Sequence, residues 1–459
     1  MPLFARDALL PDGWASDVLL DWDTHGRLTQ VLPRSACPAG TPTSRGPVIP
    51  GIPNVHSHAF QHVFAGLTEY RARDDDSFWS WRTLMYRYAA RMTPTDLYAI
   101  ATHLYIRMLR GGYTSVCEFH YLHNDADGRP YADDAVMSQT LLRAARDAGI
   151  GITLLPVLYQ HGGFGGAPAS AEQRRFVRTA ESIVALIDRL RAGIETPRER
   201  IGFAAHSLRA VSPEGLDAAL AGLVAIDATA PVHIHIAEQL REVSDCIAWS
   251  GQRPVAWLLD HANVDARWCL VHATHLSPQE AAAAARAGAV AGLCPTTEAN
   301  LGDGTFDAGG WRAAGGRWAV GSDSHICVDA AEELMSLEYS QRLALRRRNV
   351  LADARNPSVA AAMLAAAVAG GAQASGRDVA GLAVGQQADF VVLDAAHPAL
   401  AGLPADAMLS AHVFASDRRS AIHDVYMAGV ARISAGQHRD QREADARYAA
   451  VRRSYLDER

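Results

Sequence analysis

Short apolar segments alternate with helix-like stretches through the middle of the chain, and this alternation limits the possible folds more than any other feature. Eight such segments run from VIPGIPNVH, which starts at Val48, to RWAVGSD, which starts at Arg317. The stretches between them are amphipathic or rich in alanine. Strands that alternate with helices form parallel sheets, and eight such units close into a (β/α)8 barrel. We therefore predict an α/β fold with a TIM-like barrel over residues 49–370.

The two ends of the chain have a different pattern. Residues 1–48 contain short runs of alternating apolar and polar residues, divided by Gly and Pro, which is typical of strands. Similar runs return at LAVGQQADFVVLD from Leu382 and at DVYMAGVARI from Asp424. We predict that residues 1–48 and 371–459 together form a small β-sandwich domain beside the barrel, with a terminal helix in the second part.

Charge and composition argue against several kinds of partner. The net charge is −7 and no basic stripe is present, so we expect no nucleic-acid binding. The apolar stretch from Ser358 is rich in alanine, which favours a buried helix over a membrane span. The first residues do not resemble a signal peptide, and the six cysteines include no Cys-x-x-Cys pair. We therefore expect a cytoplasmic protein with reduced thiols.

Polar side chains gather where five of the eight predicted strands end. The carboxyl ends of barrel strands share one face, and that face holds the active site of such enzymes. One His-x-His pair is a weak signal in a chain with 19 histidines, so the prediction depends on the joint pattern. The residues concerned are His56, His58, His206, His235, Glu238, His272 and Asp323.

Four of these residues predict a metal site. His56 and His58 are two positions apart in an extended segment, so their side chains point the same way. His235 and Asp323 add a third imidazole and a carboxylate, a ligand set that suits zinc. Iron or manganese can bind the same ligands, so the identity of the metal stays open. His233 also faces inward, but a hydrogen-bonded core histidine is the better interpretation for it.

Three residues are candidates for proton transfer. Glu238 lies three residues after His235, where a strand leads into a helix, and this spacing lets it face a substrate. His272 ends the sixth strand, and Asp323 could accept a proton as well as bind the metal. The alternatives are a first-turn glutamate stabilised by the helix dipole and an aspartate that caps a helix. His120 and His123 lie close to the same mouth, and their roles stay open.

This set of residues resembles the amidohydrolase superfamily, with His-x-His, His, His and Asp at successive strand ends. Many members bridge two metals with a carbamylated lysine, but all 43 basic residues of this chain are arginine. Glu118, at the end of the second strand, could serve as a bridge instead. His235 followed by Glu238, however, resembles the branch of deaminases with one metal. The resemblance therefore implies one zinc ion per chain, and a homodimer, as is common among relatives.

Several segments narrow the resemblance to enzymes that deiminate N-formimidoyl-L-glutamate in histidine breakdown. It implies hydrolysis of this linear amidine to N-formyl-L-glutamate and ammonia. The substrate carries two carboxylates, and guanidinium groups bind carboxylates through two parallel donors, so Arg82 and Arg209 would hold them. Gln61, Tyr121 and His206 would add hydrogen bonds. The segments are PNVHSHAFQ at Pro53, GLTEY at Gly66, FWSWR at Phe78, CEFHYLH at Cys117 and AHSLRAVS at Ala205.

Three other functions stay open on the sequence. An aminohydrolase on the same scaffold could act on a purine, pyrimidine or triazine ring, and a neutral ring would not need both arginines. An amidase or cyclic-imide hydrolase would commonly use two metals. A non-catalytic binding protein could keep the barrel, although no structural role needs Glu238 and His272 together.

Overall fold

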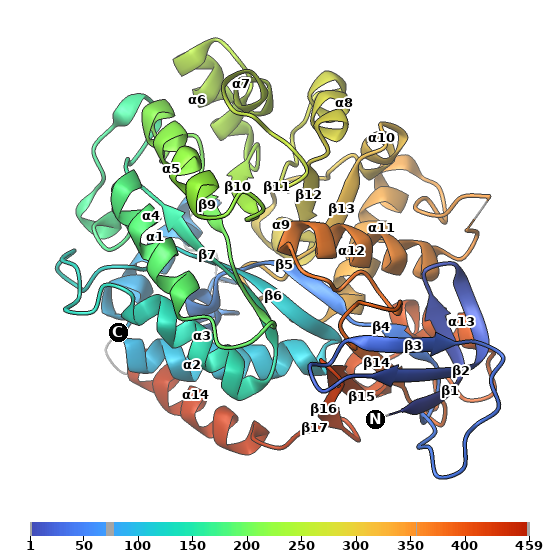
Figure 1. Cartoon of the computed structure of the whole chain (residues 1–459). Helices are drawn as coiled ribbons and strands as arrows, with labels where there is room; N and C mark the ends of the chain where they lie inside the picture. Colours follow the sequence, from blue (N-terminus) through green and yellow to red (C-terminus); the bar gives the residue numbers. More distant parts are fainter. Residues whose placement is uncertain (1, 70–77, 355, 457–459) are drawn as a thin grey trace.

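Two sheets organise the computed structural model, which describes residues 2–69, 78–354 and 356–456 (Figure 1). The larger sheet is a nearly closed parallel barrel of eight strands, with β8 (Glu199–Ile201) paired beside the third. This confirms the predicted TIM-like barrel, and each predicted apolar segment contributes one strand. In barrel order the strands are β5 (Ile52–Ser57), β6 (Tyr113–His120), β7 (Gly151–Leu158), β9 (Phe203–Ala205), β10 (Val232–Ile236), β11 (Trp268–His272), β12 (Val290–Leu293) and β13 (Arg317–Val320).

The barrel strands are apolar on both faces because helices cover them from outside and side chains fill the interior. Every residue of β6, β7 and β10 is buried. Strands of a parallel sheet that are covered on both sides read as continuous apolar runs, which explains why the sequence shows little alternation there.

Helices connect the barrel strands, and local sequence signals start several of them. The helices α2, α5 and α8 each begin with Ser or Thr followed by Pro, at Thr93, Ser212 and Ser277. In each case the hydroxyl oxygen accepts a hydrogen bond from a backbone N–H of the first turn, and the proline needs no such partner. The helices up to the seventh barrel strand are α1 (Phe78–Arg91), α2 (Pro94–Arg110), α3 (Val136–Ala148), α4 (Ala180–Ala192), α5 (Pro213–Ile226), α6 (Leu240–Ser250), α7 (Pro254–His261) and α8 (Pro278–Ala287).

The smaller sheet joins the two ends of the chain, and it fits the predicted small β-sandwich domain. The strand β4 lies at the junction, parallel to β1 on one side and antiparallel to β14 on the other. In Figure 1 the blue strands from the start of the chain and the orange to red strands from its end lie side by side. The strand order is β17 (Gln437–His438), β16 (Val430–Ser434), β15 (Ile422–Met427), β14 (Phe390–Leu393), β4 (Val48–Pro50), β1 (Leu3–Leu10), β2 (Gly13–Trp22) and β3 (Leu28–Leu32).

The last helix of the chain packs against the barrel. It contacts α2, and its Tyr448 hydroxyl donates a hydrogen bond to the backbone oxygen of His62, 2.9 Å away. His62 lies in the short helix η1 (Ala59–Phe64), directly after the predicted metal ligands of the first strand.

The remaining helices are α9 (Pro295–Leu301), α10 (Ala308–Ala313), α11 (Ala330–Leu345), α12 (Val359–Ser375), α13 (Ala405–Phe414) and α14 (Gln441–Leu456), and the other short ones are η2 (Phe164–Gly166), η3 (Ala171–Gln173) and η4 (Arg418–Ala421).

The barrel closes between β5 and β13, and this seam brings distant residues together. The backbone N–H of Asp323 donates to the oxygen of His56, and the N–H of His58 donates to the oxygen of Asp323, at 3.0 and 3.3 Å. Gly321 allows the close approach, since a Cβ atom there would lie 2.7 Å from the backbone nitrogen of His56. Closure of the barrel therefore places the aspartate beside both histidines of the His-x-His segment.

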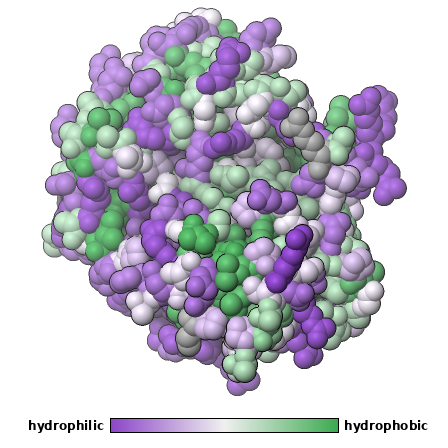
Figure 2. All heavy atoms as spheres, turned by 45° about the vertical axis from the view of Figure 1, so that its right-hand side comes forward, coloured by the Kyte–Doolittle hydropathy of each residue, from purple (hydrophilic) through white to green (hydrophobic). Residues whose placement is uncertain are grey.

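The surface is mixed in character. Figure 2 shows hydrophilic and hydrophobic side chains interspersed over one face of the molecule. Among the described residues, none of the helices combines the length and the apolar character that a membrane span requires. The apolar stretch from Ser358 forms α12, most of which is buried against the barrel, as its composition predicts.

Candidate active site

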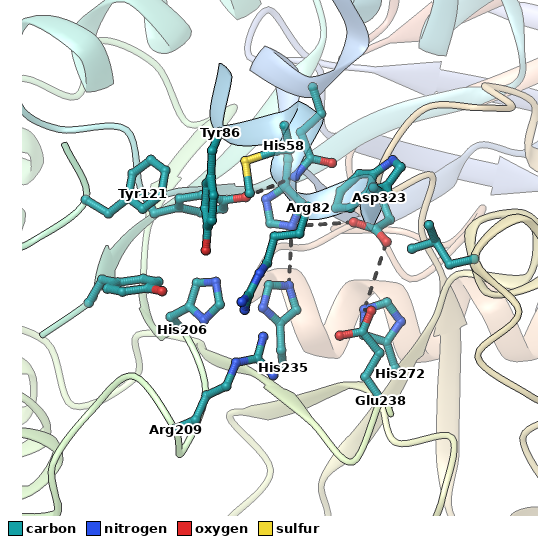
Figure 3. Close-up of a pocket in the computed structure, with 16 residues that line it drawn as sticks. His58, Arg82, Tyr86, Tyr121, His206, Arg209, His235, Glu238, His272 and Asp323 are labelled. Atoms are coloured by element: carbon teal, nitrogen blue, oxygen red, sulfur yellow. Dashed lines mark hydrogen bonds and ion pairs between the residues drawn. The ribbon is translucent and has the colours of Figure 1, made fainter. Parts of the chain in front are cut away.

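A pocket opens at the carboxyl ends of the barrel strands, with a volume of about 530 Å³ that includes its open mouth. All of the predicted site residues line it except His56, which contacts His235 and Asp323, and ten of the lining residues are labelled in Figure 3. Tyr70 of the GLTEY segment and the side chains of Phe78, Trp79 and Ser80 lie outside the described residues. Trp81, which belongs to the FWSWR segment, also lines the pocket.

Four side chains converge at the base of this pocket. The Nε2 atom of His235 lies 2.9 Å from that of His56 and 3.3 Å from that of His58. The Oδ1 atom of Asp323 lies 3.4 Å from the Nε2 atoms of both His56 and His58. In a tetrahedral site with metal–nitrogen bonds of ~2.0–2.1 Å, neighbouring ligand atoms are about 3.3 Å apart. His56, His58 and Asp323 thus lie close enough together to hold a metal ion, and His235 adjoins both histidines.

The protonation of the histidines also suits a metal. His58 donates from Nδ1 to the backbone oxygen of Phe119, 2.8 Å away, which leaves Nε2 without a proton and facing the other ligands. Burial, and next to it the neighbouring His58, lowers the pKa of His56 to about 3. Burial also lowers the pKa of His235 well below its usual value. Neutral imidazole is the form that binds metal ions, so the donor set fits zinc.

A histidine and two carboxylates lie beside these ligands. The Nε2 atom of His272 is 3.7 Å from Oε1 of Glu238 and 3.9 Å from Oδ2 of Asp323. On its other side, Nδ1 of His272 is 3.3 Å from Oε1 of Glu298. Burial alone would lower the pKa of His272, but these three carboxylates raise it to about 10. Burial raises the pKa of Glu238, against the opposing effect of His272 and Arg209, so this carboxyl can carry a proton near neutral pH.

Strained backbone conformations direct the side chains of His272 and Asp323 into the pocket. His272 and Asp323 have φ angles of 66° and 43°, in the left-handed region that residues other than glycine rarely adopt. Such a conformation costs on the order of 1–3 kcal/mol per residue and is common at functional sites. Ala237, between His235 and Glu238, has a φ of 53°. Glu242 in α6 supports this turn by accepting hydrogen bonds from the backbone N–H groups of Ala237 and Glu238, at 3.2 and 3.0 Å.

The opposite wall of the pocket is cationic. The guanidinium groups of Arg82 and Arg209 point into the same part of the pocket beside His206 (Figure 3). The Arg209 side chain is 11% exposed, its Nη1 atom has no hydrogen-bond partner among the described residues, and its ion pair with Glu242 is long, at 3.9 Å. Gln61 donates from Nε2 to the hydroxyl of Tyr121, 2.9 Å away, and its Oε1 atom has no partner in the described part of the chain. This wall therefore offers hydrogen-bond donors to an anion.

Several residues with open roles lie away from the pocket. His233 is buried, with Nε2 2.8 Å from the backbone oxygen of Ala374, which is the arrangement of a core histidine. His123 is hydrogen-bonded to the backbone oxygen of Val157, and His120 lies against it without lining the pocket. Glu118 accepts hydrogen bonds from the Ser57 hydroxyl at 2.6 Å, the Tyr105 hydroxyl at 3.2 Å and the Ala59 N–H at 2.6 Å. Its oxygens are thus engaged in structural hydrogen bonds.

Sequence reasoning missed several residues of this site. Glu242 and Glu298 each lie in a short segment that follows a barrel strand. This position after a strand is the only feature of the sequence that could have marked them as candidates. Nothing in the local sequence distinguishes the others from core residues. These others are Met85, Tyr86, Tyr159, Phe176 and Leu301, all of which line the pocket.

Known proteins resemble this chain over its whole length. The amidohydrolase family matches residues 48–432. The chain is 50% identical over 455 residues to formimidoylglutamate deiminase of Pseudomonas aeruginosa, with 99% of each chain covered. It is 28% identical over 380 residues to 8-oxoguanine deaminase of the same organism, with 80% of each covered.

Among solved structures, an amidohydrolase from Brucella melitensis matches with a TM-score of 0.93, 47% identity and 99% of each chain covered. A zinc-bound adenosine deaminase from Xanthomonas campestris, 24% identical, matches with a TM-score of 0.80 over 100% of this chain and 98% of its own.

Proposed function

Because this chain belongs to the amidohydrolase family, we propose that it hydrolyses N-formimidoyl-L-glutamate to N-formyl-L-glutamate and ammonia, a step of histidine breakdown. One observation carries the choice of substrate. Arg82 and Arg209 point into one pocket together with the predicted metal ligands and the proton-transfer residues. A small molecule with two carboxylates and an amidine would meet cations on one wall and a hydrolytic centre on the other.

His56, His58, His235 and Asp323 are the residues we propose to hold one zinc ion per chain. When bound there, the ion supplies a water molecule whose pKa is lowered to about 7, so that hydroxide is available at neutral pH. The spacing of the four groups supports a single ion. A second ion would need a bridging ligand, but the chain has no lysine and the oxygens of Glu118 are already hydrogen-bonded.

Three residues would carry the protons. The attacking water gives its proton to Oδ2 of Asp323, and its oxygen adds to the formimidoyl carbon. His272, protonated because carboxylates surround it, orients the water and stabilises the negative charge of the tetrahedral centre through Nε2. Glu238, which burial keeps able to hold a proton, delivers it to the imino nitrogen. Asp323 then passes the proton of the water to the same nitrogen, and Glu238 takes up the proton of the added hydroxyl as the carbonyl forms. The carbon–nitrogen bond breaks, ammonia leaves, and the formyl group remains on glutamate.

Replacing Arg209 with methionine is expected to raise KM by about 100-fold, because charge-assisted hydrogen bonds to one carboxylate are lost. The kcat should change much less, since Arg209 lies away from the reacting atoms. Steady-state ammonia release at varied substrate concentration measures both constants. Arg143→Met is a suitable control, because Arg143 lies on the surface beside Asp147 and does not line the pocket. An unchanged KM in the Arg209 variant would favour an enzyme for a neutral ring.

A further inference from the structure

Gln173 lies behind the cationic wall of the pocket with a fixed amide orientation. It ends η3 and is buried. Its Oε1 atom accepts a hydrogen bond from the backbone N–H of Ser170, 2.8 Å away. A backbone N–H can only donate, so this contact assigns the oxygen and directs Nε2 the other way. Nε2 donates to two phenol oxygens that line the pocket, at 2.7 Å to Tyr159 and 3.1 Å to Tyr86.

The two hydrogen bonds from Gln173 determine which hydrogen-bonding groups Tyr86 and Tyr159 can present to a ligand. Each phenol oxygen receives a hydrogen from Gln173, so its own O–H must donate to another acceptor. If one phenol donates to the other, the second still has an O–H for the pocket. Burial, and with it Tyr86, raises the pKa of Tyr159 above its usual value, although Arg209 and Arg82 oppose this shift. Tyr159 thus stays protonated, and at least one of the two phenols can donate near the two arginines.

The segment around Gln173 also holds the helix that carries Tyr86 and Arg82. Arg175, two residues further on, is fully buried. Its guanidinium donates to the backbone oxygen of Ala89 and, at 2.8 Å, to that of Met92, at the end of α1. The position of α1 and the direction of its Tyr86 hydroxyl are therefore both set by residues 173–175.

We propose that Gln173 is a positioning residue that makes the arginine side of the pocket selective for a carboxylate over a carboxamide. By donating to both phenols, it leaves at least one of Tyr86 and Tyr159 as a donor towards the group that Arg82 and Arg209 hold. A carboxylate offers only acceptors and satisfies these donors, whereas the NH2 of a carboxamide would face guanidinium N–H groups that cannot accept and phenol oxygens that already accept from Gln173. This inference rests on the proposed function, because it concerns the carboxylates of the same substrate.

Gln173→Glu is the most direct test, since glutamate has nearly the same shape but accepts where glutamine donates. The phenol O–H groups would then turn towards residue 173 and away from the pocket. We expect KM for N-formimidoyl-L-glutamate to rise about 10- to 100-fold, with kcat changing less than threefold. The preference for the diacid over its two mono-amides, N-formimidoyl-L-glutamine and N-formimidoyl-L-isoglutamine, should fall at least 10-fold for one of them.

A double-mutant cycle separates this role from simple charge repulsion by the new carboxylate. In a Tyr86→Phe, Tyr159→Phe background, Gln173→Glu should cause less than a threefold further loss, because its effect passes through the phenols. An equal loss with and without the hydroxyls would overturn the proposal. Gln341→Glu is the matched control, because Gln341 is equally buried and donates to the backbone oxygen of Phe306, but lies outside the pocket. Melting temperatures of all variants report any damage to the fold.

Binding measurements distinguish failure of this inference from failure of the proposed function. Calorimetry with N-formyl-L-glutamate and N-formyl-L-glutamine needs no turnover. A wild-type enzyme that prefers the diacid, with a preference that Gln173→Glu or the tyrosine variants remove, supports the role of Gln173 even if another amidine is the true substrate. A preference that survives in all of these variants contradicts it, even if the wild-type enzyme releases ammonia as proposed.

Discussion

The Glu238→Gln enzyme is expected to lose at least ~10²-fold in kcat while it keeps its metal, because general acid–base transfer contributes about 10²–10⁴-fold. Glutamine has the shape of the protonated acid but cannot release a proton to the imino nitrogen. Glu238 lies 3.7 Å from Nε2 of His272 and is not among the four proposed metal ligands, so the metal site should remain. Ammonia release and metal analysis on the same sample measure both quantities.

Glu280→Gln provides the control for the loss of a buried carboxylate. Glu280 is also buried and pairs with Arg253 at 2.7 Å, but it lies outside the pocket. Its variant should unfold more easily and turn over substrate normally. Near-normal kcat in Glu238→Gln would refute the assignment of this residue as the proton donor.

The His235→Ala enzyme is expected to bind less than about a tenth of an equivalent of zinc and to lose at least ~10³-fold in activity, because one of the four proposed ligands is lost and the activated water depends on the bound metal. The Nε2 atom of His235 lies within 3.3 Å of those of both His56 and His58, so its loss removes the ligand that faces both. Metal content after dialysis and steady-state turnover test this expectation.

His233→Asn is the natural control, because the same strand carries it two residues earlier. His233 is equally buried but bonds to the backbone oxygen of Ala374, so its loss should lower stability and leave the zinc content unchanged. Loss of zinc in the His233 variant with full zinc in the His235 variant would reverse the two assignments.

The barrel could be predicted from sequence because its strands are buried on both faces. Apolar runs such as VHIHIA at Val232 differ clearly from the polar and alanine-rich segments between them. The convergence of His56, His235 and Asp323 then followed from topology alone, since parallel barrel strands end on one face. The structure adds the seam between β5 and β13, where backbone hydrogen bonds join Asp323 to the His-x-His segment.

The rest of the site depends on contacts between distant residues, which have no local signal. The amide of Gln173 bonds a tyrosine 87 residues away in the chain, and a buried glutamine looks the same in sequence as a surface one. The left-handed φ angles of His272 and Asp323 are held by tertiary packing against the preference of the residues themselves. Glu298 likewise reaches His272 only after the short helix α9, which carries it, has folded.

Ammonia release from N-formimidoyl-L-glutamate by the purified protein, with zinc counted in the same sample, tests the central claim most directly. We predict rapid release at about one zinc ion per chain, since the four proposed ligands adjoin one another and two arginines point into the pocket beside them. Absence of release from a zinc-loaded sample would contradict the proposed substrate and favour a ring aminohydrolase. A content near two zinc ions per chain would contradict the single-metal site.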